Sequence, residues 1–363
     1  MLDSKIIQAF FFLLRAGLWE KENIPASFTP LSDQEWKQLF DLSIQQTVDG
    51  IVYYGVQKLQ DEWLPPRSLH VRWTIRINQL EQLHTKMNKT ITEQAILFKA
   101  HKIDAILLKG QGLAQYYHQP TSRSCGDIDW CFNGKQDFDR ANSVIKNSMI
   151  SLTSQAGNSC FYFWEGIETE HHRQIFDIHN PLKKAYLRKL TDRYPIEKKV
   201  RFNGEVVLTL PPILNMLQIN SHILKHMLSF GIGIRQLCDA ARLYFNEAKN
   251  IDRTQLLNIY RALGILPWIN LLHQLLHDFL GLPKENLPIQ LDRSNNANWM
   301  MEEILYAGNF GFYDNRFGTS DQSGLKRSKR RQRLLRNMKN YLPYATQEVI
   351  WFPIVHFLSG LKK

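Results

Sequence analysis

Hydrophobic residues recur every three or four positions over most of the first hundred residues, and this spacing predicts helices. The apolar run 10–14 is too short to span a bilayer, so we expect it to form the buried face of a first helix. Ser32-Asp33-Gln34-Glu35 has the form of a capping box and predicts a second helix start. A longer helix after Pro65-Pro66 is indicated by the apolar positions Trp73, Ile77, Leu80, Leu83, Met87, Ile91, Ala95 and Phe98. Residues 1–102 therefore form a predicted N-terminal helical region with a packed apolar stripe.

The pattern changes at Ile103, where short apolar runs and alternating positions replace the helical period. Ile128 and Trp130 alternate with Asp127 and Asp129, which predicts a strand with one apolar and one acidic face. We expect strands at 103–108, 128–130, 161–164 and 174–179, and helices at 111–117 and 137–149. From Pro211 the helical period returns, with helices expected at 211–228, 234–246, 253–264, 268–280, 297–306 and 346–359, and a basic helix ending near 340. The predicted fold class is α+β: a small mixed-sheet core at 103–210, flanked by helical regions at 1–102 and 211–363.

Composition excludes several classes of protein. The 363 residues are 44% hydrophobic and 22% charged, which excludes a wholly disordered chain. The four cysteines show no CxxC spacing, so neither a disulfide framework nor a structural zinc site is expected, and a reducing compartment fits. Since no signal peptide or membrane span is evident either, we predict a cytoplasmic location.

The net charge of +11 is concentrated in one segment. Residues 326–339 hold eight lysines and arginines and no acid, which predicts a basic helix with Leu334, Leu335 and Met338 as a narrow apolar strip. Such a helix could bind nucleic acid or another polyanion, in a salt-dependent manner. An anionic membrane surface, an acidic protein partner or a merely solvated face are the alternatives.

Asp127-Ile128-Asp129 is the most informative tripeptide in the chain. On a strand, side chains two residues apart share a face, so the two carboxylates can bridge hard divalent cations, which prefer oxygen ligands. Asp177 has apolar neighbours on both sides and is our candidate for a third carboxylate from another strand. Two metal ions held in this way would stabilise the attacking and leaving oxygens of a phosphoryl or nucleotidyl transfer.

Lys109-Gly110 ends the first predicted strand at a turn that opens a helix. Such a turn directs backbone amides at an anion, and the Lys109 charge can reach a phosphate. Arg123 is a second candidate for phosphate contact. Taken singly, an acid pair or a Lys-Gly turn is common in proteins, but here they follow one another in a fixed order. That order predicts a catalytic site.

Further polar residues are candidates for lining a cleft. His222 and His226 lie four apart, on one helical face, and could bind zinc, but no nearby glutamate or cysteine completes a ligand set. Arg235 and Asp239 are also four apart and could simply pair, or their helix could close over a nucleotide. We expect His179, like His171 and His172, to be a surface or hydrogen-bonded histidine rather than a metal ligand.

The motifs together resemble an uncharacterised nucleotidyltransferase family, found widely in bacteria, of the polymerase-beta-like superfamily. Its pattern is matched by Leu108-Lys109-Gly110, Arg123, Gly126-Asp127-Ile128-Asp129 and Asp177-Ile178-His179. The stretches 222–239 and 308–311 also resemble the family, so the likeness covers roughly residues 95–320. Lys109-Gly110 stands where most members of the superfamily carry Gly-Ser.

The resemblance implies an enzyme that moves a nucleoside monophosphate from a nucleoside triphosphate to an acceptor. Asp127, Asp129 and Asp177 would hold two Mg²⁺ ions, and Asp177 would also act as base toward the acceptor hydroxyl. Lys109, Gly110 and Arg123 would hold the triphosphate. The alternative is a module that keeps the fold without catalysis and binds nucleic acid or protein. The acceptor, the preferred base and the oligomeric state are left open.

Overall fold

The structure, a computed structural model, describes residues 4–19, 28–155, 159–317 and 327–360. The N-terminal region contains the helices α1 (Ser4–Leu18), α2 (Asp33–Gln45), α3 (Asp49–Val56) and α4 (Arg67–Ala100). The apolar run 10–14 lies in α1, where Phe10, Leu13 and Leu14 are fully buried, as predicted. The capping box is also confirmed: the Ser32 amide donates to Glu35 at 2.7 Å, and the Glu35 amide donates to the Ser32 hydroxyl at 3.4 Å.

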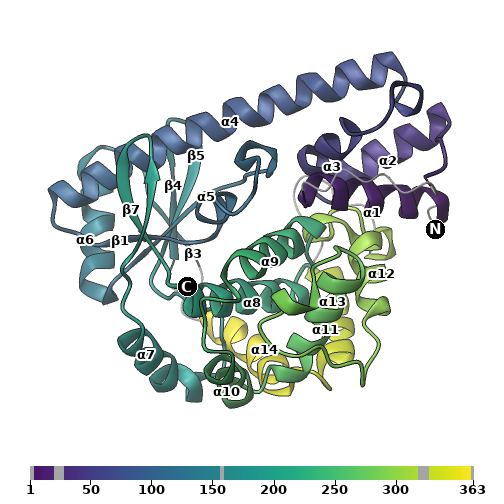
Figure 1. The fold of residues 1–363 in the computed structure, drawn as a ribbon. Helices are drawn as coiled ribbons and strands as arrows, with labels where there is room; N and C mark the ends of the chain where they lie inside the picture. The colour runs from purple at the N-terminus through teal and green to yellow at the C-terminus, as the bar shows by residue number, and fades with distance from the viewer. Residues whose placement is uncertain (1–3, 20–27, 156–158, 318–326, 361–363) are drawn as a thin grey trace.

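Helix α4 joins the two halves of the molecule. In Figure 1 it crosses the top of the fold from the N-terminal helices to the sheet. Its predicted apolar stripe is confirmed, but the stripe serves two cores. Trp73 and Ile77 pack with the helices, whereas Met87, Ile91 and Phe98 pack with the sheet. A single long helix can therefore fix where the sheet lies relative to α1–α3.

The central region forms one seven-stranded mixed sheet in the order β3-β4-β5-β2-β1-β7-β6. Its elements are β1 (Ala105–Leu107), α5 (Lys109–Ala114), β2 (Ile128–Phe132), α6 (Gly134–Asn147), β3 (Thr153–Gln155), β4 (Ser159–Trp164), β5 (Ile167–His172), α7 (Lys184–Arg193), β6 (Lys198–Phe202) and β7 (Glu205–Thr209). Strand β2 pairs antiparallel with β1 and parallel with β5, while β1 pairs parallel with β7. This mixed sheet with flanking helices confirms the predicted fold class.

The two faces of the sheet meet different partners. Ile128, Trp130 and Phe132 of β2 pack in the cluster that contains residues of α4 and α6. Cys131 of the same strand belongs to the larger cluster formed with the C-terminal helices. Because alternate strand residues face opposite sides, Asp129 shares the face of Cys131, toward those helices. The chain therefore presents the acidic face of β2 to a helical wall.

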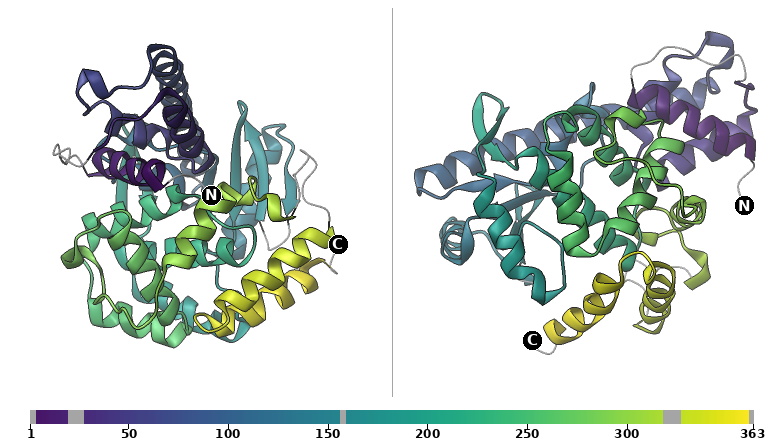
Figure 2. Two further views of the ribbon diagram at one scale, coloured as in Figure 1. Left: turned by 90° about the vertical axis from the view of Figure 1, so that its right-hand side faces the viewer. Right: turned by 60° about the horizontal axis from the view of Figure 1, so that its bottom comes forward.

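That wall is built by α8 (Pro212–Leu228), α9 (Ile234–Glu247), α10 (Arg253–Leu263), α11 (Leu266–Asp278), α12 (Asn298–Ala307), α13 (Arg327–Tyr341) and α14 (Thr346–Gly360). The helices predicted from the apolar period agree with these bounds to within two or three residues at most ends. Figure 2 shows α13 and α14 running side by side at the end of the chain. Across the described part of the chain, no helix has the length and apolar character needed to cross a membrane.

The basic helix α13 is partly used inside the protein. Arg333 is 5% exposed and donates to the Gly311 carbonyl at 3.3 Å, with Asp314 at 3.8 Å. Arg336 pairs with Glu303 of α12 at 2.5 Å. Leu334 and Met338 pack against the core, as the expected strip requires, but Leu335 is 56% exposed. Lys326 and the side chains of 327–331 lie outside the described residues, so polyanion binding at 326–339 stays a prediction.

Several predicted elements are corrected. The expected strand 174–179 is not a strand, because its amides bond to side chains: Asp177 to the Ser221 hydroxyl and His179 to Glu348. The predicted helix 111–117 lies at 109–114 instead. The strands β3, β5, β6 and β7 and the helix α7 were not predicted. The division of the chain at residues 102 and 210 stays a prediction.

Close packing of α1 on α3 leads to a first prediction. A Cβ atom on Gly55 would lie 2.0 Å from the Leu13 carbonyl oxygen, so the two helices would have to separate. We expect Gly55→Ala to lower the free energy of unfolding by about 1–3 kcal/mol despite the better helix propensity of alanine. Urea unfolding followed by circular dichroism measures this. Gly112→Ala, whose new Cβ would make an ordinary 3.7 Å contact, is the control, and equal stability of both variants would contradict the prediction.

A second prediction concerns His273 in α11. The ring is fully buried, neither ring nitrogen has a partner among the described residues, and burial lowers the pKa of His273 to about 3. The unfolded chain takes up a proton here below about pH 6.5, whereas the folded protein does not. This group therefore contributes no penalty above that pH and costs about 1.4 kcal/mol of stability per pH unit below it.

Urea unfolding at pH 7 and pH 5 tests this on the wild type and on His273→Phe. We expect the loss of stability between the two pH values to be about 2 kcal/mol smaller in the variant. An identical pH dependence in the two proteins would show that His273 is protonated in the folded state.

Candidate functional site

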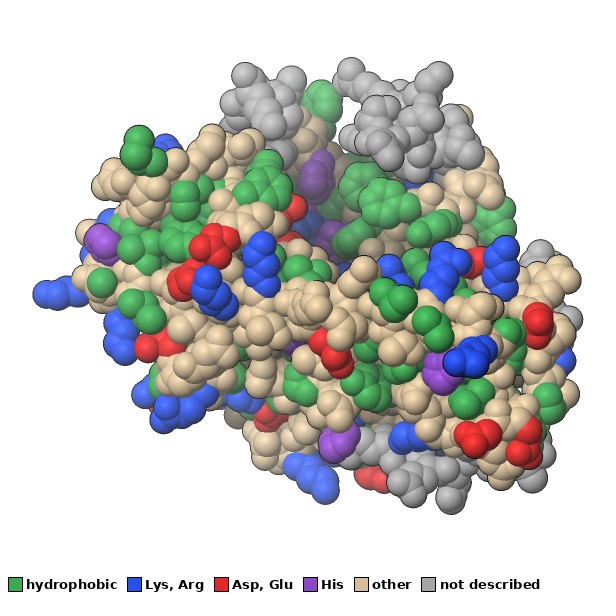
Figure 3. All heavy atoms as spheres, turned by 90° about the horizontal axis from the view of Figure 1, so that it is seen from above, with side chains coloured by type: hydrophobic (Ala, Val, Ile, Leu, Met, Phe, Trp, Pro, Cys, Tyr) green, Lys and Arg blue, Asp and Glu red, His purple; other side chains and the backbone are tan. Residues whose placement is uncertain are grey.

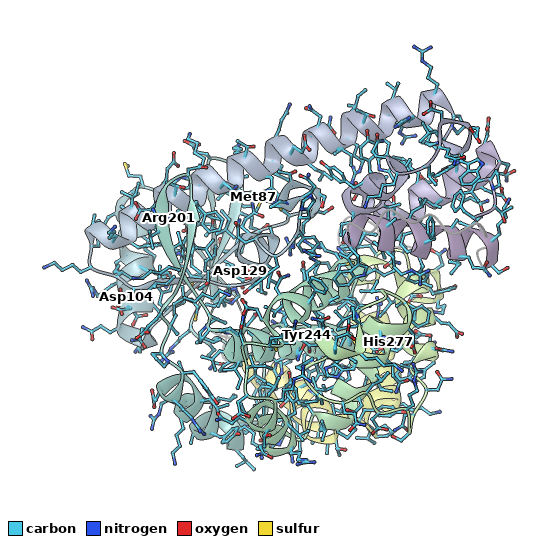
Figure 4. All side chains as sticks on the ribbon, viewed as in Figure 1. Met87, Asp104, Asp129, Arg201, Tyr244 and His277 are labelled. Atoms are coloured by element: carbon cyan, nitrogen blue, oxygen red, sulfur yellow. The ribbon has the colours of Figure 1, made fainter. Side chains whose placement is uncertain are left out.

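The acidic pair lies at the start of β2, beside the C-terminal helices. Asp129 is 2% exposed, and Asp127 precedes the first strand residue. Figure 4 labels Asp129 at the boundary between the sheet and the helices below it. On the opposite face of β2, the Trp130 indole donates to Gln94 of α4 at 2.6 Å, which fixes the orientation of the strand. The predicted acidic face is thus present and directed into the molecule.

The Lys109-Gly110 turn meets this pair directly. The Leu108 amide donates to the Asp129 carbonyl at 2.9 Å, and the Lys109 ammonium lies 3.0 Å from the Asp129 carboxylate. Gly110 has φ +40°, and a Cβ there would come within 3.3 Å of the Asp127 carbonyl oxygen. Glycine is therefore favoured by both conformation and space, and the turn holds Lys109 over the acids.

Neighbouring charges shift the pKa values of Asp127 and Asp129 in opposite directions. The Asp129 charge and burial raise the pKa of Asp127 to about 6. Burial would raise the pKa of Asp129 too, but Lys109 and His172 outweigh it and hold that pKa below its usual range. Burial would lower the pKa of Lys109, yet the surrounding carboxylates of Asp129, Asp127, Asp177 and Glu170 raise it. The lysine therefore stays charged, within electrostatic reach of four acids.

The site also contains two residues of β5 that the sequence did not lead us to expect there. Glu170 is the register partner of Asp129 across the parallel β2–β5 pair. The His172 ring nitrogen Nε2 lies 2.6 Å from the Asp129 carboxylate and 3.5 Å from Glu170. The expectation that His172 is hydrogen-bonded is confirmed, but its partner is the candidate acid itself. The alternation of buried Thr169 and His171 with Glu170 and His172 carried this signal.

This donor set fits a divalent cation. Ligand atoms of Asp129, Glu170 and His172 all lie within 4.8 Å of one another, and Asp127 adds a further carboxylate beside them. Carboxylate oxygens suit Mg²⁺, and a mixed set with one imidazole also suits a transition-metal ion. The residues present are therefore compatible with the predicted metal site.

Asp177 lies in the irregular segment after β5 and faces helix α8. One carboxylate oxygen accepts from His222 Nδ1 at 2.8 Å and the other lies 2.9 Å from Lys225 Nζ. Burial would raise the pKa of Asp177, but Lys225 and His222 hold it well below its usual range. Burial and the Lys109 charge lower the pKa of His222 to about 4, so this ring is neutral at pH 7.

The other cleft histidines form aromatic contacts. The rings of His222 and His226 lie 4.4 Å apart, and His226 contacts Phe310 at 5.0 Å. His179 lies beside Phe352 of α14, and its amide donates to Glu348 at 2.7 Å. Among the described residues, the His222–His226 pair has no third ligand in a metal-binding group.

Arg123, Arg235 and Asp239 come together beneath the acids, but in a different pairing from the one considered for them. Arg123 binds Asp239 in a bidentate ion pair at 2.7 and 2.8 Å, and both side chains are less than 5% exposed. Arg235 donates to the Ser124 carbonyl at 2.8 Å instead of pairing with Asp239. The interpretation of Arg235 and Asp239 as a simple pair is thus wrong, because Arg123 occupies the carboxylate.

Seen from above, the molecule is hollowed beside these elements. Figure 3 shows histidine and basic side chains within the hollow and hydrophobic side chains along its rim. The site residues come from the turn after β1, from β2 and β5, from the segment around Asp177, and from α8 and α9. A mixed-charge cleft between the sheet and a helical wall can hold an anionic ligand together with a cation.

Comparison with known proteins identifies the family. A family model described as "Uncharacterised nucleotidyltransferase" matches residues 32–281. No curated protein matches the chain. The crystal structure of an antigenic nucleotidyltransferase-like protein from Paracoccidioides brasiliensis is 14% identical, with a TM-score of 0.30, over 46% of this chain and 76% of its own. Since the family model covers more than half of the sequence and contains Asp127, Asp129, Glu170, Asp177 and Asp239, the chain belongs to this uncharacterised nucleotidyltransferase family.

Proposed function

We propose that the protein is a metal-dependent nucleotidyltransferase, which moves a nucleoside monophosphate from a nucleoside triphosphate to an acceptor hydroxyl. The observation that carries the proposal is the position of Lys109, 3.0 Å from Asp129 and within reach of Asp127, at a turn that directs it into the acidic cleft. In the reaction, the acceptor hydroxyl releases its proton and its oxygen bonds to the α-phosphorus, while the bond from the α-phosphorus to the oxygen that bridges to the β-phosphate breaks and pyrophosphate leaves.

Asp127 and Asp129 are the proposed metal ligands, and two Mg²⁺ ions fit the reaction class. When bound, the metal supplies neutralisation of the phosphate charge and stabilisation of the oxygens at the reacting phosphorus. The raised pKa of Asp127 shows that two adjacent carboxylates repel each other here. A cation between them would relieve that repulsion, which favours metal binding at this position.

Two residues are candidates for the third metal-binding carboxylate. Asp177 is the sequence-based assignment, but both of its oxygens already bind His222 and Lys225. Glu170 lies opposite Asp129 and within the 4.8 Å group. We therefore propose Glu170 as the third metal-binding carboxylate. Because its pKa is lowered, Asp177 is a weak base toward the acceptor hydroxyl. It is better suited to orient that hydroxyl by accepting a hydrogen bond from it.

Lys109 and the Gly110 amide are the proposed contacts for the triphosphate. A charged ammonium in a buried turn gains more from a phosphate than from water, and the turn leaves room for close approach of the chain. The free thiols of Cys125, Cys131, Cys160 and Cys238 are compatible with the proposed cytoplasmic location.

The acid pair provides the main test. We expect Asp127→Asn and Asp129→Asn each to abolish Mg²⁺-dependent binding of nucleoside triphosphates, because each removes a charge that the cation needs. Calorimetric titration with ATP, GTP, CTP and UTP, with and without Mg²⁺, measures the binding. Asp104→Asn, an exposed carboxylate outside the cleft, is the matched control. Wild-type affinity in both acid variants, with an unchanged circular dichroism spectrum, would sink the metal assignment.

The choice between Glu170 and Asp177 gives a further prediction. If Glu170 holds the metal, Glu170→Gln should weaken Mg²⁺ binding in the presence of a triphosphate by at least tenfold, about 1.4 kcal/mol. Asp177→Asn should leave that affinity within about threefold and lower the rate of transfer instead. The reverse pattern, with Mg²⁺ affinity lost only in Asp177→Asn, would return the third position to the sequence-based assignment.

A further inference from the structure

The structure contains two arginines beside the acidic pair, and only one of them is fully used by the protein. Arg123 donates twice to Asp239 and once to the Ser124 carbonyl, at 3.3 Å. The Tyr117 hydroxyl donates to the same Asp239 carboxylate at 2.8 Å. Since all three side chains are almost completely buried, Arg123 could reach a ligand only by breaking a desolvated ion pair.

Arg235 is in the opposite situation. Its guanidinium has five N–H donors, and its single side-chain hydrogen bond within the described residues is to the Ser124 carbonyl. The Nε atom is buried without any partner there. A buried donor left in this state costs free energy, so the site is incomplete as the protein alone presents it.

Arg235 also forms no ion pair of its own within the described part of the chain. Both arginines donate to one carbonyl, that of Ser124, so two cations lie close together, while the Asp239 carboxylate pairs with Arg123. Burial and the Arg123 charge lower the pKa of Arg235. The Arg235 charge in turn acts to lower the pKa of Asp127, although the two side chains form no ion pair among the described residues.

The backbone holds Arg235 in place for this. It lies in the first turn of α9, where the Ile234 amide donates to the Gln46 side chain at 3.2 Å and the Arg235 amide to the Gln46 carbonyl at 3.4 Å. Because these amides are already satisfied, the side chain rather than the helix end is the free donor. A fixed backbone with an unengaged guanidinium is a preorganised anion site.

We infer that Arg235, and not Arg123, is the arginine that binds the phosphate groups of the nucleotide, together with Lys109. The inference rests on the proposed function and deepens it. Arg123 is then a positioning residue: paired with Asp239, it donates to the Ser124 carbonyl, which also accepts from the Arg235 guanidinium. A phosphate oxygen would accept hydrogen bonds from the Arg235 donors that have no partner among the described residues.

The test compares Arg235→Gln, Arg235→Lys and the exposed control Arg201→Gln with the wild type. The ligands are inorganic tripolyphosphate, ATP with Mg²⁺, and adenosine, followed by calorimetry. We expect Arg235→Gln to weaken tripolyphosphate and ATP about 10- to 100-fold, as loss of a charge-assisted hydrogen bond does, and to leave adenosine unchanged. Arg235→Lys should recover part of the affinity, and the control should match the wild type.

Thermal unfolding separates the two arginines. We expect Arg123→Gln to lower the melting temperature much more than Arg235→Gln, since only the former leaves Asp239 buried and unpaired. A folded Arg235→Gln protein with wild-type affinity for tripolyphosphate would overturn the inference while leaving the proposed function intact. A wild-type protein that binds neither ATP nor tripolyphosphate would overturn both.

Discussion

Burial of charge between the sheet and the C-terminal helices is the constraint on which the site depends. A carboxylate taken out of water loses several kcal/mol of hydration unless a charged partner and hydrogen bonds replace it. Lys109 meets that need for Asp129, Lys225 for Asp177, and Arg123 for Asp239. The Lys225–Asp177 and Arg123–Asp239 pairs join the central region to helices α8 and α9, and the Lys109–Asp129 pair joins the turn after β1 to β2, where Figure 4 labels Asp129. The pairing of charges, more than the strand pairing alone, therefore determines how the sheet and the helices meet.

The N-terminal region braces the same boundary from the other side. Gln46 is fully buried and bonds to the chain at both α9 and α12, with its amide nitrogen 3.1 Å from the Ile304 carbonyl. Asp49, also fully buried, accepts from the Ser124 hydroxyl at 3.2 Å, just before the acidic pair. At Gly50 an added Cβ would come within 2.2 Å of the Ser122 carbonyl oxygen, so the two segments touch backbone to backbone. This explains physically why a family match that contains the site begins as early as residue 32.

Local sequence patterns predicted local structure well, whereas contacts between segments distant in the chain could not be predicted from the sequence. The capping box, the α4 stripe and the acidic strand each depend on neighbours within a few residues, so their patterns are visible in the chain. The hairpin β6–β7 was missed although Asn203 and Gly204 carry a two-residue turn signal, with φ of +47° and +91°. Asp177 was placed on a strand because its neighbours alternate, but its backbone bonds to side chains of α8. The proximity of Glu170 to Asp129 depends on β5 pairing with β2, and nothing local specifies that neighbour.

The helices beyond the family match are tied to the site by the same burial of charge. Glu348 of α14 is 1% exposed, and its carboxylate accepts from the amides of His179 at 2.7 Å and Asn180 at 3.1 Å. Without those amides the carboxylate would be buried and unsatisfied, and without the carboxylate the chain after Asp177 would lose its hydrogen bonds. Arg333 of α13 fixes the Gly311 turn beside Phe310, which contacts His226. The C-terminal helices and the Asp177 segment are therefore ordered together, and the geometry of the cleft depends on residues from position 46 to position 348.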